Sequence, residues 1–425
     1  MSVTAQRAAE LHPPLSRPGA EYRLTRWLAV LTCALAPAYT VRWHIGFYPT
    51  TALEAGIILT LLAFAWEYFR QRQAIEWRSP FTWFGALLVI AAAISVLVAP
   101  DRRAALGLFR AYFIEPVLFF VVLTTVIRNS RQAFTVVLGL GVGGMVIALA
   151  NAATTLDALR HHVVDTAQNA PVAIYQTSNA VALFLVPILA VAGSLLLYSR
   201  VARERRWSAV FVAVAGIAVI LSFSRGGYVA LLAVAVGLAL SHPRRWWFLG
   251  ALALLVAIAT RVPIIASRLA HEINMNDPNN TLAGRIHLWR VTLTMMRQHL
   301  VFGTGLSGYA HFMTPWPNGL VQVIYPHNLI LNFWVATGIL GVIAFLGLLV
   351  AAFRTASRGW RVVDAGWRPF ELGVLLALVA IVVHGLVDVP YFKNDLSFEF
   401  WVLLAISWAG ILAQRRVSPG TATDR

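Results

Sequence analysis

Cysteine, lysine and charged residues in general are scarce in this chain of 425 residues. Cys33 is the single cysteine, so an intramolecular disulfide and a cysteine-based zinc framework are both excluded. Lys393 is the single lysine. Only 12% of the residues are charged and 59% are hydrophobic, whereas soluble chains carry about a quarter of charged residues. A soluble fold of this size is therefore excluded.

Apolar runs of about 20 residues recur along the chain, which is the signature of membrane-spanning helices. They predict an all-α polytopic membrane protein with about 12 transmembrane helices, forming one integral membrane domain over residues 1–425. The predicted spans lie near residues 27–41, 51–69, 81–99, 108–127, 133–151, 175–198, 207–223, 227–241, 246–262, 326–353, 370–389 and 397–413.

Two of these boundaries rest on a physical argument. The polar stretch that ends at Arg26 lacks a small-residue cleavage site after a short apolar core, so we interpret the first run as a retained span rather than a signal peptide. Residues 207–241 would form one long span if Ser224–Gly227 were ignored. An arginine at the centre of such a span is costly, which favours a turn at the membrane surface.

The net charge of +16 would suggest a nucleic-acid partner in a soluble protein, but here the basic residues lie in short loops between apolar runs. This pattern indicates membrane topology and contact with lipid headgroups, and no nucleic-acid partner is expected. An even number of spans places both termini on one side. If that side is cytoplasmic, every inner loop carries arginine, as the positive-inside rule demands.

Several basic residues fall on the predicted outer face, against that rule. They are Arg42, Arg102, Arg103, Arg110, Arg160, Arg225, Arg261, Arg268, Arg285, Arg290, Arg297 and Lys393. Guanidinium groups bind phosphate with two parallel hydrogen bonds, so a cationic outer vestibule predicts a phosphate or diphosphate ligand. For any one of them taken alone, a side chain that extends to the lipid headgroups is the favoured interpretation.

The polar segment from Pro263 to Tyr325 interrupts the apolar runs and is predicted to be a large outer loop between spans nine and ten, with a helix of its own. Apolar residues follow a helical spacing there at Ile286, Trp289, Leu293, Met296 and Leu300. Arg285 lies at the edge of this apolar face, where it can point into a site. The opposite, basic face fits a helix lying along the membrane interface.

Two polar patterns carry candidate chemistry. In the turn Phe223–Tyr228, two glycines permit close backbone approach and display Arg225 at the start of a helix, where an anion is favoured. In the sequence Tyr325–Leu329, proline suits a helix start and places His327 in its first turn. A neutral imidazole there can accept a proton from a hydroxyl group.

The remaining polar positions have structural alternatives. His384 and Asp388 share a helix face in span eleven, and Arg110 and Glu115 lie in span four; both pairs fit either a site or helix orientation. The outer loop 151–174 contains His161, His162 and Asp165, which we interpret as solvated residues rather than metal ligands. The glycine-rich turn Gly303–Tyr309 lacks the lysine of a phosphate loop and is expected to re-enter the membrane surface.

Taken in order, these patterns resemble the O-antigen ligase and polymerase superfamily of bacterial cell-envelope enzymes. The resemblance covers about residues 207–390. It rests on the Ser224–Gly227 turn, Gly284 and Arg285 with Trp289, Phe302–Gly305 with Tyr309, Pro326–Asn328, and the later helix with His384 and Asp388.

The resemblance implies a membrane glycosyltransferase of the C type, with an undecaprenyl-diphosphate-linked glycan as donor and the lipid A–core of lipopolysaccharide as acceptor. It places the enzyme in the inner membrane of Gram-negative bacteria, with the active site facing the periplasm. His327 is then the expected base, while Arg225 and Arg285 hold the diphosphate and stabilise its leaving charge. Direct displacement implies inversion, and neither a metal nor a cofactor is expected. Further substrate contacts are expected from Arg102, Arg110, Arg290, Tyr309, Asn328 and Asp388.

Three other functions remain open at this point. An O-antigen polymerase and a protein O-oligosaccharyltransferase share the arginine and histidine pattern. The ligase is favoured because the chain ends soon after span twelve, without a further outer domain for a protein acceptor. A transporter of an anionic lipid is disfavoured because no internal repeat is visible and the polar residues gather at one face.

Overall fold

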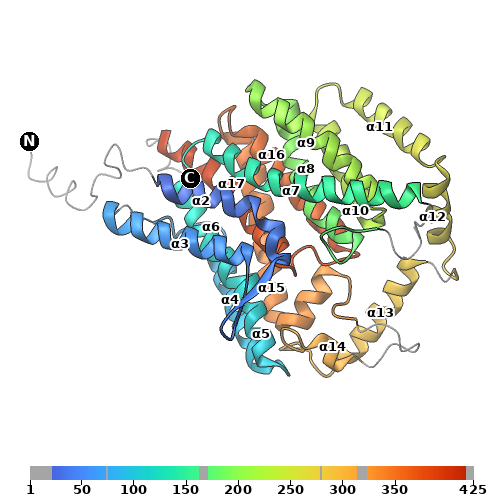
Figure 1. The fold of residues 1–425 in the computed structure, drawn as a ribbon, viewed down its shortest axis with the longest axis horizontal. Helices are drawn as coiled ribbons and strands as arrows, with labels where there is room; N and C mark the ends of the chain where they lie inside the picture. Colours follow the sequence, from blue (N-terminus) through green and yellow to red (C-terminus); the bar gives the residue numbers. More distant parts are fainter. Residues whose placement is uncertain (1–21, 73–74, 162–170, 278–279, 314–322, 418–425) are drawn as a thin grey trace, which may run out of the picture.

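Helices make up nearly all of the computed structural model, which describes residues 22–72, 75–161, 171–277, 280–313 and 323–417 (Figure 1). The amino-terminal half contains α2 (Arg23–Ala34), η1 (Ala36–Thr40), β1 (Arg42–Ile45), β2 (Tyr48–Thr51), α3 (Ala52–Gln71), α4 (Thr82–Val98), α5 (Arg102–Phe109), η2 (Arg110–Ile114), α6 (Glu115–Val126), α7 (Ser130–Arg160) and α8 (Ser178–Tyr198). The carboxy-terminal half contains α9 (Ala202–Leu221), α10 (Arg225–Ser241), α11 (Arg245–Ala259), α12 (Pro263–Ile273), α13 (Thr281–Met296), α14 (Tyr309–Phe312), α15 (Leu329–Val362), α16 (Arg368–Gly385) and α17 (Asn394–Val417).

All twelve predicted apolar runs lie on helices. Within the described residues, seven helices are long and apolar enough to cross a membrane: Ala52–Gln71, Arg102–Val126, Ser130–Arg160, Ser178–Tyr198, Leu329–Val362, Arg368–Gly385 and Asn394–Arg416. Three shorter apolar helices, α4, α10 and α11, carry further runs, and α2 and α9 carry the remaining two. The chain is an all-α polytopic membrane protein, as predicted.

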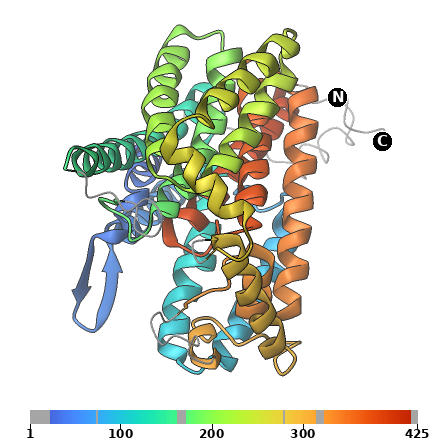
Figure 2. The same ribbon diagram turned by 90° about the vertical axis from the view of Figure 1, so that its right-hand side faces the viewer.

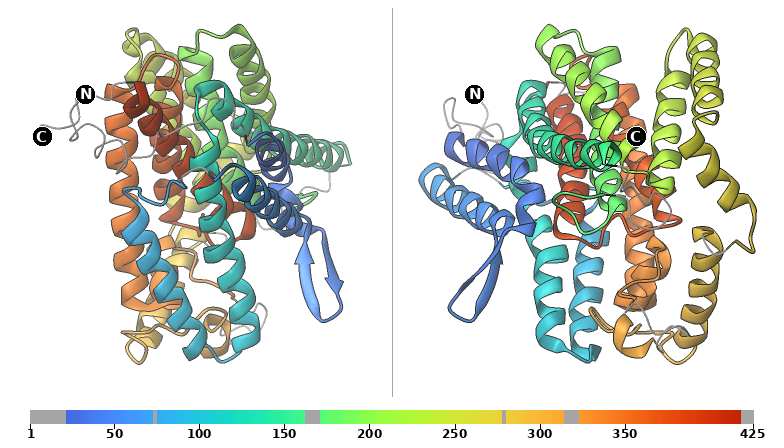
Figure 3. Two further views of the ribbon diagram at one scale, coloured as in Figure 1. Left: turned by 90° about the vertical axis from the view of Figure 1, so that its left-hand side faces the viewer. Right: turned by 45° about the vertical axis from the view of Figure 1, so that its right-hand side comes forward.

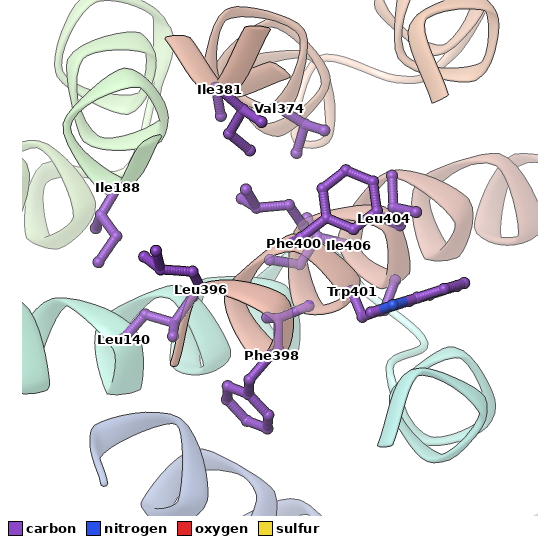
Figure 4. Close-up of a cluster of buried hydrophobic side chains, with 14 of the residues drawn as sticks. Leu140, Ile188, Val374, Ile381, Leu396, Phe398, Phe400, Trp401, Leu404 and Ile406 are labelled. Carbon is purple, nitrogen blue, oxygen red and sulfur yellow. The ribbon is translucent and has the colours of Figure 1, made fainter. Parts of the chain in front are cut away.

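Helix α17 forms the centre of the bundle. It packs against α6, α15 and α16, and its apolar stretch is completely buried. Phe398, Phe400 and Trp401 lie among side chains from neighbouring helices, including Leu140 of α7 and Val374 of α16 (Figure 4). Close packing of this kind holds helices together where lipid supplies no hydrophobic driving force between them.

Helix α11 shows the opposite behaviour, because none of its residues is buried. It lies at the periphery, in an arc that continues through α12 and α13 (Figure 1). Trp246 and Trp247 are exposed. An apolar helix with no buried face is stable only where hydrocarbon surrounds it, so α11 faces lipid.

The helix ends sort into two groups at opposite ends of the bundle. At one end, Arg416 donates to Glu76 at 3.2 Å, and the charge of Arg128 acts on both Arg416 and Tyr22. The start of α2 therefore lies near the end of α17. At the other end, α8, α10, α15 and α17 begin and α16 ends. Polar residues at these helix ends are brought within reach of one another.

A single two-stranded hairpin breaks the helical pattern of the described residues. Strands β1 and β2 pair antiparallel, with Arg42 opposite Thr51 and Ile45 opposite Tyr48. The hairpin projects from the helices, as Figure 2 and both views of Figure 3 show. It lies in the link between the first two predicted spans, where sequence patterning gave no strand signal.

The glycine-rich turn after α13 is fixed to a break in α15. Helix α15 is interrupted at Gly338, whose φ is +69°. Ile339 N donates to Val301 O at 3.0 Å, and Thr304 N donates to Val335 O at 2.7 Å. The turn thus takes over backbone groups that the helix leaves unpaired at its break. It anchors the segment between α11 and α15 to this break.

One detail differs from the sequence-based predictions. Helix α7 continues to Arg160, so residues 151–160 are helical rather than part of a loop; His162 and Asp165 lie outside the described residues. On α13, Met296 of the predicted apolar residues is buried and Leu293 is exposed; Leu300, which follows the helix, is exposed too.

Met296 packs with Tyr309 and Val335, so one residue of the predicted apolar face joins α13 to α14 and α15.

Replacing Gly338 with alanine is predicted to destabilise the protein. The positive φ disfavours any side chain by about 1–3 kcal/mol, and a Cβ there would overlap the carbonyl oxygen of Val301. We expect a lower thermal unfolding midpoint in detergent. Gly250→Ala is the matched control, because nothing lies within 4 Å of a Cβ at that position of α11. Equal midpoints for the two variants would contradict the anchoring role of the break.

Candidate active site

The turn between α9 and α10 displays Arg225 as predicted. Phe223 adopts a φ of +53°, and Ser224 caps α10 by accepting from Gly227 N at 3.1 Å. A Cβ on Gly226 would overlap the ring of His384, and one on Gly227 would overlap Ala182. The two glycines therefore let the start of α10 pack directly on α16 and α8.

His327 lies just before α15 rather than in its first turn. The helix begins at Leu329, and Asn328 is its N-cap, accepting from Leu331 N at 2.9 Å. His327 itself has a φ of +50°, a left-handed conformation that is rare for a residue with a side chain. Trp289 of α13 fixes the preceding peptide by donating to Pro326 O at 2.9 Å. The imidazole is thus displayed by a strained turn that the outer segment holds in place.

The carboxylate of Asp388 connects these two turns. His327 Nδ1 lies 3.4 Å from Asp388 Oδ1, and Asn179 Nδ2 donates to Asp388 Oδ2 at 2.9 Å. Ser224 Oγ in turn donates to Asn179 Oδ1 at 2.8 Å. A polar chain from Ser224 through Asn179 and Asp388 therefore leads from the arginine turn to His327.

The surroundings of Asp388 keep it ionised although it is only 2% exposed. Burial alone would raise its pKa. The hydrogen bond from His327, together with the charges of His327, His384 and Arg285, instead holds the pKa of Asp388 well below its usual range. Since an ionised carboxylate only accepts hydrogen bonds, His327 donates through Nδ1, and in a neutral imidazole Nε2 is then the acceptor.

Arg225 faces α12 and α13. Its Nη1 lies 2.5 Å from Glu272 Oε1 and donates to Thr281 Oγ1 at 2.9 Å. Its Nε and Nη2 are buried and have no hydrogen-bond partner among the described residues. Unpaired buried donors are costly, so this guanidinium is prepared for an acceptor that approaches from the site.

Arg285 shares this environment from α13. Its pKa is lowered, first by burial and also by the charge of Arg225, while Asp388 and Glu272 act in the opposite direction. Arg225, Arg285 and His327, the three residues predicted to be catalytic, therefore lie around one group of charges with Asp388.

Two residues of this group were missed from the sequence. Glu272 accepts from Thr281 N at 3.1 Å and Leu282 N at 3.2 Å, so it caps α13 while it pairs with Arg225. Asn179 holds Asp388 from the first turn of α8. The only sequence signal for Asn179 is a polar residue near the start of an apolar run.

Other predicted substrate contacts lie elsewhere or already have partners. Arg110 pairs with Glu54 at 2.9 Å and Glu115 at 3.0 Å. Arg102 is exposed at the start of α5, and Arg290 is exposed on α13.

Tyr309 and Asn328 have structural partners of their own. Tyr309 is buried with its hydroxyl 2.7 Å from that of Thr292. Asn328 caps α15 and donates to Leu386 O at 3.0 Å, so both ends of its amide are engaged.

No group of three or more His, Cys, Asp or Glu side chains within the described part of the chain is arranged to hold a metal ion.

Comparison with known proteins bears on the same region. Residues 209–346 match the family model described as O-antigen ligase. The predicted resemblance to the O-antigen ligase and polymerase superfamily is confirmed. No curated protein matches the chain. The matched segment includes Arg225, Glu272, Arg285 and His327, whereas Asn179 and Asp388 lie outside it.

The site makes a prediction about pH. Burial would raise the pKa of Glu272, but hydrogen bonds from Thr281 and Leu282 and the charge of Arg225 lower it overall. A lowered folded-state pKa contributes stability above the unfolded value of about 4.3, and this is lost as the pH falls through the folded value. The difference in unfolding midpoint between the wild type and Glu272→Gln should therefore be present at pH 7 and shrink below about pH 4.

Glu76→Gln is the matched control, because Glu76 pairs with Arg416 at the other end of the molecule. A difference for Glu272→Gln that does not depend on pH would contradict the ionised pair with Arg225.

Proposed function

We propose that this membrane glycosyltransferase-like protein transfers an undecaprenyl-diphosphate-linked O-antigen glycan onto lipid A–core. The family match supports an enzyme of the O-antigen ligase and polymerase type. The observation that carries the finer proposal is the pair of buried, unpartnered donors on Arg225, whose neighbour Ser224 is linked to His327 through Asn179 and Asp388. This arrangement suits a diphosphate leaving group next to a base.

The donor side of the site is formed by Arg225 and Arg285. Two guanidinium groups offset the negative charge that develops as the bond between the sugar and the diphosphate breaks. The carboxylate of Glu272 forms an ion pair with Arg225, and a phosphate oxygen would bind the guanidinium group in the same way. In this proposal the diphosphate takes the place of Glu272 on Arg225, and the segment from α12 to α13 adjusts with it.

The acceptor side is formed by His327. Asp388 fixes the proton on Nδ1, so Nε2 accepts the proton of the acceptor hydroxyl while its oxygen bonds to the anomeric carbon. The bond from that carbon to the diphosphate oxygen breaks on the opposite face, which inverts the configuration. Undecaprenyl diphosphate leaves with its charge on the arginines, and no metal is required in this scheme.

The same proposal includes location. The protein lies in the inner membrane of a Gram-negative bacterium, with both termini cytoplasmic and the 263–325 loop forming a periplasmic subdomain. The grouping of α2's start with α17's end at one pole, away from His327, supports this orientation.

His327→Ala is predicted to lower the transfer rate by about 10²–10⁴-fold, the usual contribution of a positioned base, because no other group accepts the hydroxyl proton. Binding of the lipid-linked donor should remain, since the arginines are unchanged. Both are measured with purified protein in proteoliposomes. His311→Ala, on the short helix α14, is the matched control and should retain full activity.

Transfer at the wild-type rate by His327→Ala would refute the role of the base.

The role of the arginines is tested with Arg225→Lys. This change keeps the positive charge but removes the planar guanidinium group, so it should raise the KM for the donor. Unchanged donor use by Arg225→Lys and by Arg285→Ala would refute the diphosphate assignment.

The acceptor is tested by reconstitution with lipid-linked glycan and three acceptors offered together: lipid A–core, a second glycan-lipid, and a peptide. The proposal predicts that the glycan appears on lipid A–core. A lengthened glycan-lipid would identify a polymerase, and a glycosylated peptide would identify a protein O-oligosaccharyltransferase.

A further inference from the structure

A pocket that the scheme above does not use lies between the β1–β2 hairpin and the helical stretch α5–η2. Its volume is about 530 Å³. The residues that matter for its chemistry are Arg42, His44, Arg103, Arg110, Tyr112 and Asn394.

Two guanidinium groups in the pocket lining are unpaired. Arg42 and Arg103 are exposed, and neither side chain has an ion-pair or hydrogen-bond partner among the described residues. Arg110 differs, because Glu54 and Glu115 offset its charge. The lining acid Asp101 accepts from Ala104 N at 3.0 Å and so caps α5. Two free guanidinium groups facing one cavity favour an anionic ligand with several acceptor oxygens.

The hairpin that forms one wall places this pocket next to lipid. Ile45 is 67% exposed and Phe47 is 86% exposed, at a tip that projects away from the helices (Figures 2 and 3). Large apolar side chains exposed on a membrane protein are favourable in the interfacial layer. A ligand in this pocket contacts basic side chains and lies beside lipid acyl chains. This environment suits a lipid with a phosphorylated headgroup.

Tyr112 links the pocket to His327. It lines the pocket, and its ring packs edge-on against Phe392, with the ring centroids 6.3 Å apart. Phe392 in turn packs on Phe333 of α15, the helix that begins just after His327, with centroids 4.6 Å apart. Helices α12 and α13, which contact Arg225, lie on the other side of the bundle from the hairpin (Figure 1). The pocket therefore approaches His327 from the side opposite the donor arginines.

We propose that this pocket binds the phosphorylated headgroup of the acceptor glycolipid, with Arg42 and Arg103 on its phosphates and its saccharide directed toward His327. The assignment rests on the proposed function, since it requires an acceptor lipid at His327. It adds that the acceptor must carry phosphate groups and that Arg42 and Arg103 bind them.

The test compares Arg42→Gln, Arg103→Gln and the double variant with the wild type, using full-length protein in proteoliposomes. Two acceptors are used: the native glycolipid and the same glycolipid after chemical removal of its phosphates. The double variant should raise the KM for the native acceptor about tenfold, as expected when charge-assisted hydrogen bonds are lost. Its KM for the donor should not change. With the dephosphorylated acceptor, variant and wild type should behave alike.

Arg160→Gln is the matched control, since it removes an exposed arginine from the end of α7, outside the pocket, and should have no effect. An equal loss with the dephosphorylated acceptor, or a raised KM for the donor, would overturn the assignment. So would displacement of the glycolipid by an equal concentration of phosphatidylglycerol, because the pocket would then bind any anionic headgroup.

A binding measurement without catalysis separates this inference from the proposed function. Phosphate-dependent binding of the glycolipid that needs Arg42 and Arg103, without any glycan transfer, would refute the proposed function but support the assignment of the pocket. Transfer without a phosphate requirement would remove the pocket assignment alone.

Discussion

The buried carboxylate of Asp388 is the interaction on which the rest of the site depends. A charge at 2% exposure is costly unless it is paired and hydrogen-bonded. Here it accepts a hydrogen bond from Asn179 of α8 and another from His327 in the turn before α15. One unfavourable group thus fixes the relative positions of three segments far apart in sequence, and it also sets which nitrogen of His327 carries the proton.

The outer segment between α11 and α15 supplies the other half of the site. Its glycine turn is hydrogen-bonded to the break at Gly338, and Trp289 holds the peptide before His327. Glu272 pairs with Arg225 from the same segment. The segment therefore positions the base through backbone contacts. Its contacts with Arg225 are one ion pair with Glu272 and one hydrogen bond with Thr281, which an incoming anion can replace.

Sequence patterning was most successful where the physics is local. Apolar runs select helices because the bilayer requires them, and Arg225, Arg285 and His327 stand out because charged groups are rare in such a chain. Partners that come from distant segments left no such signal. Glu272 and Asn179 were missed for this reason. Glu54, which pairs with Arg110 from another helix, left no signal either.

The central claim is that Asp388 couples the arginine turn to the base through Asn179. A double-mutant cycle on the transfer rate, with Ser224→Ala and Asp388→Asn, tests it directly. Ser224 and Asp388 both hydrogen-bond to Asn179. We predict a coupling free energy of about 0.5–3 kcal/mol. Effects that add to within about 0.3–0.5 kcal/mol would contradict the coupling.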